Sequence, residues 1–238
     1  MGKSTVHRLL ATLREFDLIW LDPITSNYAL GSRILRWSDL LVQQNLLVRH
    51  GLPILRDLVS VGRETANLAV LDGTDVLYMA QFESMERLRM SEAVGTRQPA
   101  HSTALGKALL AGLPEEEFDQ LYSKLDVLKS PTPNTITDKR HLKEHLQKVR
   151  NEGLAYDFEE NVAGVICLGT VVRNFTGRPI AAMSVSLPIQ RFRGERSSHL
   201  KEHLLEAALR LSHELGYSAS DPAPRVVRDS GSAAQATL

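Results

Sequence analysis

The stretch Thr65–Phe82, TANLAVLDGTDVLYMAQF, decides the fold class. Two runs rich in apolar residues, 65–71 and 76–82, flank the tetrapeptide Asp72-Gly73-Thr74-Asp75. Asp-Gly between two such runs is a strong signal for a β-hairpin, because glycine readily adopts the positive φ that a tight turn requires. The sequence therefore predicts that an antiparallel sheet begins here.

A second hairpin is predicted nearer the carboxyl end. Residues 164–173 and 179–188 are rich in Val, Ile and Ala, and the glycine-containing loop Asn174–Arg178 separates them. Helical spacing of apolar residues occupies the segments around the two hairpins. The predicted helices cover residues 53–61, 102–113, 114–125, 138–151 and 195–215, with Ser102 or Thr103 as an N-cap and Gly112, Gly153 and Gly216 as stops. An antiparallel sheet flanked by helices places this part of the chain in the α+β class.

The amino end has a different pattern. Residues 3–14 have the apolar spacing of a short amphipathic helix, and two strand-like runs, 18–21 and 28–30, follow it around a turn-forming segment. Helix followed by hairpin is the order of a winged helix-turn-helix. Residues 32–48 then predict a helix that is apolar over much of its surface, so we expect it to pack against a dimer mate or the next domain.

Composition limits the function classes. The chain has 238 residues, of which 43% are hydrophobic and 24% charged, as in ordinary globular proteins. No apolar run approaches the length of a membrane span, the amino end has no secretory signal, and Cys167 has no second cysteine to pair with. We therefore expect a cytoplasmic protein with no membrane partner. The formal net charge of zero does not decide whether DNA is bound.

Several short motifs carry a likeness to a known family. They are Lys3–Leu10 (KSTVHRLL), Tyr28–Gly31 (YALG), His101–Ala108 (HSTALGKA), Tyr156–Glu160 (YDFEE), Gly164–Cys167 (GVIC) and Ala181–Pro188 (AAMSVSLP). In order and spacing they resemble the IclR family of transcriptional regulators. The resemblance implies a partial winged helix-turn-helix at 1–31, a linker helix at 32–48 and a GAF-like effector domain at 49–217. Residues 218–238 have no periodicity and are rich in Ser, Ala and Pro, so we expect a disordered tail there. The resemblance also implies a homodimer or homotetramer.

The resemblance further implies which residues contact a small-molecule effector. Carried over to this sequence, they are Ala104, Leu105, Asp157, Cys167, Ser184 and Ser186. A helix start and two hydroxyls suit a small organic acid, and Asp157 favours one with a hydroxyl or keto group. The alternative is that the serines bond to backbone, the cysteine is a small buried group, and the aspartate caps a turn.

By the same resemblance, DNA contacts come from the first helix. The candidates for binding a double-stranded operator are Lys3, Ser4, Thr5, His7 and Arg8. A merely solvated helix face is the alternative, and a phosphate-binding loop at Gly2–Thr5 lacks the upstream glycine that such a loop requires. The family's first two helices have no counterpart here, so we expect an incomplete DNA-binding module, caused by a misplaced start codon or partial gene model. A sensor module that has lost DNA binding is the rival function.

Two patterns resemble enzyme sites. His141–His145 and His199–His203 both match H-x-x-E-H, a zinc-peptidase signature. Their histidines flank the apolar stripes of amphipathic helices, so we expect no zinc there. Cys167, His101 and Asp157 could form a nucleophilic trio, but no sequence feature activates the thiol. We expect no enzyme activity, metal or cofactor.

Overall fold

The computed structural model describes residues 1–125 and 127–218 and divides the chain into two compact units, Met1–Gly51 and the part from Leu52 onward. This division lies close to the expected boundary after residue 48 without coinciding with it. The expected tail, 218–238, lies outside the described residues except for its first residue. Among the described residues, no helix combines the length and apolarity needed to cross a bilayer.

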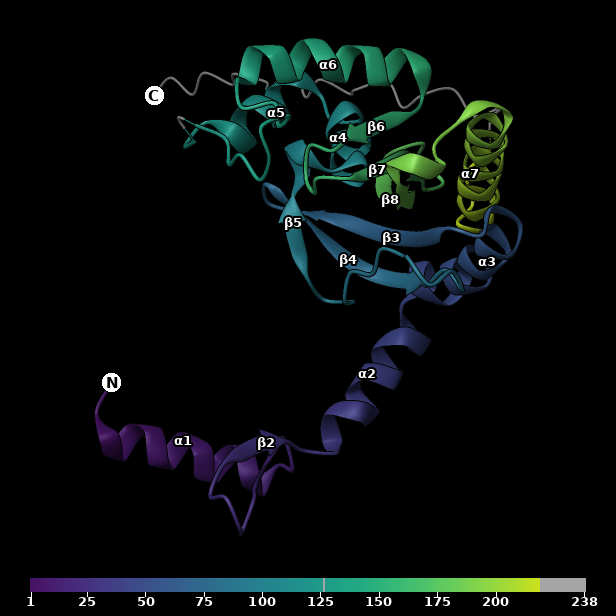
Figure 1. Ribbon diagram of the computed structural model, residues 1–238. Helices are drawn as coiled ribbons and strands as arrows, with labels where there is room; N and C mark the ends of the chain where they lie inside the picture. The colour runs from purple at the N-terminus through teal and green to yellow at the C-terminus, as the bar shows by residue number, and fades with distance from the viewer. Residues whose placement is uncertain (126, 219–238) are drawn as a thin grey trace, which may run out of the picture. The chain divides into compact units, whose positions relative to one another are not determined.

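The first unit has the predicted helix and hairpin. Helix α1 (Lys3–Glu15) precedes the antiparallel strands β1 (Ile19–Leu21) and β2 (Tyr28–Leu30) (Figure 1). The Asp22 carboxylate holds the turn between the strands by accepting hydrogen bonds from the Ile24 N–H (2.9 Å) and the Thr25 hydroxyl (2.7 Å). An aspartate that bonds to the backbone two residues ahead is a common turn former.

The next helices begin and end at residues other than those predicted. Helix α2 (Arg33–Gln44) ends earlier than residue 48, and α3 (Leu46–Gly62) begins well before residue 53. The break lies at Asn45, whose extended backbone interrupts the helix and whose side chain accepts a hydrogen bond from the Val48 N–H (3.3 Å). Pro53 lies inside α3, although the sequence pattern suggested that a helix starts there. The N-cap residue decides the boundary more strongly than the proline does.

The second unit contains a six-stranded antiparallel sheet in the order β5-β4-β3-β8-β7-β6. Its strands are β3 (Thr65–Asp72), β4 (Asp75–Phe82), β5 (Arg97–Pro99), β6 (Ala155–Phe158), β7 (Val165–Arg173) and β8 (Pro179–Pro188). Both predicted hairpins are present, and β3 pairs with β8 to join them. Gly73 has φ +60° at the first turn, a conformation that favours glycine. The two edge strands were not predicted, because three or four residues are too few to reveal an alternating pattern.

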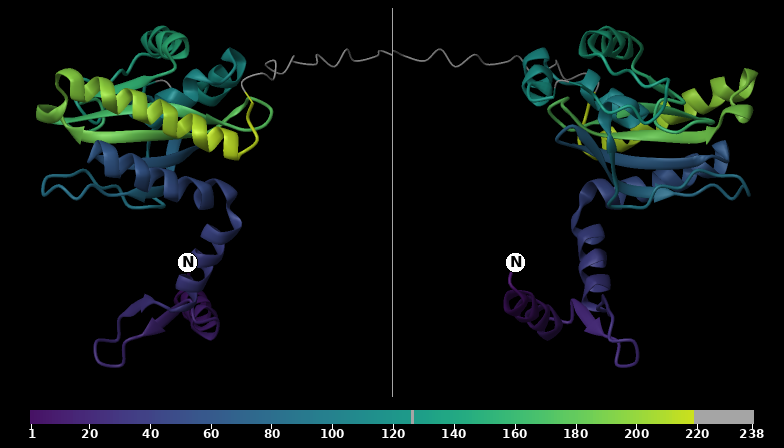
Figure 2. Two further views of the ribbon diagram at one scale, coloured as in Figure 1. Left: turned by 90° about the vertical axis from the view of Figure 1, so that its right-hand side faces the viewer. Right: turned by 60° about the vertical axis from the view of Figure 1, so that its left-hand side comes forward.

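Helices cover both faces of this sheet. Besides α3, they are α4 (Ala104–Ala111), α5 (Glu115–Tyr122), α6 (Lys139–Glu152) and α7 (Gly194–Glu214), with short 3₁₀ turns at Ala100–Ser102 and Ile189–Arg191. Helix α4 packs on one face with α6 outside it, and α3 and α7 lie side by side on the other face (Figures 1 and 2). The predicted α+β class, with an antiparallel sheet flanked by helices, is confirmed. Helix α5 ends three residues before the predicted end.

Candidate functional site

A small cavity lies where the first turn of α4 meets β6, β7 and β8. All six residues that the resemblance marked as effector contacts line it: Ala104, Leu105, Asp157, Cys167, Ser184 and Ser186. The cavity has a volume of about 30 Å³, which is room for about two waters. The fold therefore brings residues that are far apart in sequence into one enclosure.

Strand register explains why the sheet residues meet. Asp157 pairs with Cys167, and Cys167 pairs with Ser186, so the three form one row across β6, β7 and β8. The Cys167 thiol donates to the Ser186 hydroxyl oxygen at 3.1 Å. Ser184 stands two residues before Ser186 on β8 and therefore projects from the same face. This arrangement forms a semi-polar floor.

The first turn of α4 forms the opposite side. Thr103 is the N-cap of α4, and its hydroxyl accepts a hydrogen bond from the Gly106 N–H (3.1 Å). The first N–H groups of a helix lack partners inside the helix, so those of Ala104 and Leu105 are potential donors to a ligand. A Cβ at Gly169 of β7 would lie 2.6 Å from the Ala104 carbonyl oxygen. Glycine at this position therefore permits the close approach of strand and helix.

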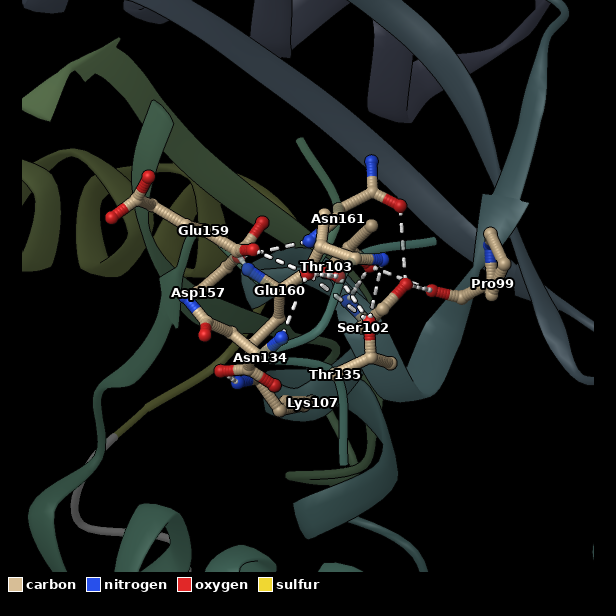
Figure 3. Close-up of polar contacts among 12 residues, drawn as sticks. Pro99, Ser102, Thr103, Lys107, Asn134, Thr135, Asp157, Glu159, Glu160 and Asn161 are labelled. Atoms are coloured by element: carbon tan, nitrogen blue, oxygen red, sulfur yellow. Dashed lines mark hydrogen bonds and ion pairs between the residues drawn. The ribbon is translucent and has the colours of Figure 1, made fainter. Parts of the chain in front are cut away.

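Asp157 is held by backbone hydrogen bonds at the edge of the cavity. Its Oδ1 accepts from the N–H groups of Glu160 (2.7 Å) and Asn161 (3.2 Å) (Figure 3). Burial raises the pKa of Asp157 to about 7, although these hydrogen bonds and the Lys107 ammonium oppose the change. Near neutral pH this carboxyl can therefore carry a proton and act as a hydrogen-bond donor.

A buried ion pair stands beside Asp157. The ammonium of Lys107 on α4, which has no exposed surface, bonds to Glu160 Oε1 (Figure 3). The Glu160 carbonyl also accepts hydrogen bonds from the hydroxyls of Thr132 (3.1 Å) and Thr135 (2.6 Å). Burial raises the pKa of Glu160, and Lys107 opposes that rise. The pair links α4 to the β6–β7 loop, so it positions two sides of the cavity.

The arrangement does not form a nucleophilic centre. Burial raises the pKa of the Cys167 thiol, and Asp157 raises it further, so the reactive thiolate is disfavoured. The ring of His101 bonds to the Lys129 carbonyl (2.7 Å) rather than to Cys167. Within the described ranges no group of His, Cys, Asp or Glu side chains has a metal-binding arrangement, and this includes both H-x-x-E-H segments.

The cavity also has walls that sequence reasoning missed. They are Tyr78, Met90, Glu92, Thr103, Asn161, Val162 and Val165. Thr103 was predicted only as a possible cap. Most of the others lie in loops without periodicity, where the sequence provides no signal of which side chains turn inward. Burial, with nearby Cys167, Glu92 and Asp157, raises the pKa of Tyr78, so its hydroxyl remains a neutral donor.

The predicted DNA-contacting residues occupy the first two turns of α1. Lys3, Ser4, His7 and Arg8 are exposed, and Thr5 is partly exposed. They lie on a surface helix that is followed by the β1–β2 hairpin. This geometry leaves the cationic and hydroxyl groups free to meet phosphates and base edges, which is what the prediction requires.

Comparisons with known proteins identify the family. Residues 40–213 match the family model described as "Bacterial transcriptional regulator IclR C-terminal". The chain is 34% identical over 212 residues to the HTH-type transcriptional regulator BhcR of Paracoccus denitrificans, covering 89% of this chain and 76% of that protein. The crystal structure of Thermotoga maritima IclR superposes with a TM-score of 0.79 at 29% identity, covering 91% of this chain and 87% of that one. An IclR homolog from Microbacterium hydrocarbonoxydans complexed with 4-hydroxybenzoate also has a TM-score of 0.79, at 26% identity, covering 90% and 86% of the two chains. The chain therefore belongs to the IclR family of bacterial transcriptional regulators.

Proposed function

We propose that this protein is a ligand-responsive, DNA-binding transcriptional regulator whose second unit senses a small organic acid. The observation that carries the proposal is that the first turn of α4 and the hydroxyls of Ser184 and Ser186 converge on one cavity. A helix N-terminus favours an anion, and the hydroxyls can donate to a carboxylate. The Microbacterium relative holds 4-hydroxybenzoate, a carboxylate that also carries a hydroxyl group. That precedent supports an acid as the ligand class.

The chemistry of Asp157 narrows the ligand further. A carboxyl with a pKa near neutrality can donate a proton to a keto, hydroxyl or carboxylate oxygen, whereas a permanently ionised one would repel an acid. The cavity volume of about 30 Å³ favours a ligand of few atoms. A short hydroxy acid or keto acid meets the first condition, and because it is larger than two waters its binding requires the cavity walls to move apart.

Calorimetry with a panel of short 2-hydroxy acids, short 2-oxo acids and 4-hydroxybenzoate tests this proposal. We expect at least one acid to bind, and Ser184→Ala or Asp157→Ala to weaken its affinity by about tenfold or more through the loss of one hydrogen bond to a charged group. Ser212→Ala is the matched control, because Ser212 is also a buried serine but lies on α7 away from the cavity. Unchanged affinity in both cavity variants would refute the assignment of this site.

DNA binding is proposed for the exposed face at the start of α1. We expect the protein to bind DNA flanking its own gene, with an affinity that falls as salt rises, because phosphate contacts release counterions. Arg8→Ala should weaken this binding. Arg140→Ala should not, because the exposed Arg140 lies on α6 of the other unit. A mobility-shift titration measures both variants, and equal shifts for both would contradict the role of α1. Such a regulator acts in the cytoplasm, where bacterial DNA lies.

Self-association is proposed for α2. Its large apolar residues Trp37, Leu40 and Leu41 are all exposed and lie on one face of the helix, at i, i+3 and i+4. Exposed apolar groups at helical spacing favour pairing with a second copy, as expected for a homodimer or homotetramer. Light scattering should give a mass of two or four chains, and Leu41→Glu should lower it. A monomeric wild-type protein would refute the proposal.

A further inference from the structure

Beside the cavity floor, the side-chain amide of Asn67 on β3 contacts both cavity serines. Asn67 is almost fully buried and pairs with Ser184 in the sheet. Its Nδ2 lies 3.4 Å from the Ser184 Oγ and 3.3 Å from the Ser186 Oγ. Asn67 itself is not among the residues that line the cavity. Its contact with the cavity is through the hydroxyls of Ser184 and Ser186.

The orientation of the Asn67 amide follows from a second amide. Gln81 Nε2 on β4 donates to Asn67 Oδ1 at 2.9 Å, which turns the Asn67 NH₂ group toward the serines. On the other side of Gln81, the Ser91 hydroxyl donates to two oxygens. They are Gln81 Oε1 at 3.2 Å and Glu83 Oε1 at 2.6 Å. An amide NH₂ group carries two donors, one for each serine oxygen. The polar chain therefore runs from Gln81 through Asn67 to the cavity floor.

This polarity decides what the serines can offer a ligand. The Ser186 oxygen accepts from both Asn67 and Cys167, so both of its lone pairs are occupied and only its proton remains. Ser184 has one lone pair occupied by the same amide. Hydroxyls whose oxygens already accept are oriented to donate. The opposite orientation of Asn67 would take the serine protons and leave lone pairs facing the cavity.

We propose that Asn67 is a specificity-determining, positioning residue that makes the hydroxyls of Ser184 and Ser186 donors to a ligand carboxylate. The inference rests on the proposed function, because it assumes that the acid binds at this floor. It adds the reason why the site would prefer a carboxylate over an uncharged amide of the same shape. In Asn67→Asp, which keeps the size of the side chain, oxygens would replace the donors and accept the serine protons instead.

The test compares acetate with acetamide, which have the same shape and differ in charge and donor pattern. Binding of each to the full chain is measured by saturation-transfer NMR on the ligand methyl signal. Wild type should prefer acetate, and Asn67→Asp should weaken acetate binding by about tenfold or more, the effect of losing one hydrogen bond to a charged group. Acetamide affinity should change by less than about twofold, because its NH₂ group can donate to the serine lone pairs that then face the cavity.

Two controls separate the possible failures. Asn174→Asp adds the same charge in the β7–β8 loop, where its Oδ1 can keep accepting from Thr176 and Arg178, and it should leave both affinities unchanged. If Asn67→Asp does not fold, Asn67→Leu removes the donors without adding charge and should lower the ratio of acetate to acetamide affinity. If the Asn67 variants lost equal affinity for acetate and acetamide, or lost none, the role of Asn67 would be overturned. If wild-type acetate binding is absent, or is undiminished in Ser184→Ala, the proposed site itself fails and this inference fails with it.

Discussion

Replacing Asp157 by Asn tests the electrostatics of the cavity through protein stability. Asn has the same size and keeps the Oδ1 that accepts from the N–H groups of Glu160 and Asn161, but it cannot ionise. Burial raises the pKa of Asp157 to about 7 in the folded protein, whereas an unfolded chain has a value of about 3.9. The variant therefore removes one titration and little else.

The sign and size of the effect follow from proton linkage. Between the two pKa values the folded protein holds a proton that the unfolded chain has released, so stability falls as pH rises through this window and levels off above the folded pKa. One pKa unit corresponds to about 1.4 kcal/mol. The free energy of unfolding of the wild type should therefore fall by roughly 2.5 kcal/mol between about pH 5 and about pH 8, relative to that of Asp157→Asn.

Urea unfolding followed by circular dichroism at several pH values measures this difference. Asp138→Asn is the control, because the exposed Asp138 caps α6 and the His141 N–H lowers its pKa. Its stabilising effect is present above its unfolded pKa and is lost only in acid, so its difference from wild type should stay constant over the same range. If the free energy of unfolding changed with pH in the same way in wild type and Asp157→Asn, the account of a buried carboxyl that holds a proton would be refuted.

Three further substitutions test the elements that build the cavity. Gly169→Ala places a Cβ 2.6 Å from the Ala104 carbonyl oxygen. It should therefore lower the free energy of unfolding by about 1–3 kcal/mol and weaken acid binding. An unchanged melting temperature and an unchanged affinity in calorimetry would show that the strand and helix have room to separate. Lys107→Met leaves Glu160 buried without its cation, so it should lower the free energy of unfolding in urea by about 3–5 kcal/mol. Adding Glu160→Gln should restore most of this free energy. No recovery in the double variant would contradict the importance of the pair. Thr103→Ala removes the α4 cap and should lower the free energy of unfolding by about 1 kcal/mol. Thermal unfolding would detect this loss, and an unchanged melting temperature would contradict it.

Local patterns in the sequence determined most of the secondary structure. The turn chemistry of Asp72-Gly73 and the Val-rich and Ile-rich runs predicted both hairpins, because glycine and β-branched residues have strong local preferences. The Thr103 cap also acted as a local signal. The junction of α2 and α3 at Asn45 was missed, since Pro53 seemed the stronger signal.

Only the tertiary structure decided how the candidate site is assembled. The six effector residues came from family resemblance, and no periodicity links Ala104 to Asp157 or Ser184. Strand register brings them together, and the walls from loops, such as Met90, carry no sequence signal at all. The pKa of Asp157 and the orientation of Asn67 depend on burial and on partners far away in the chain. Local sequence fixes backbone preference, whereas desolvation and hydrogen-bond polarity arise only from the packed fold.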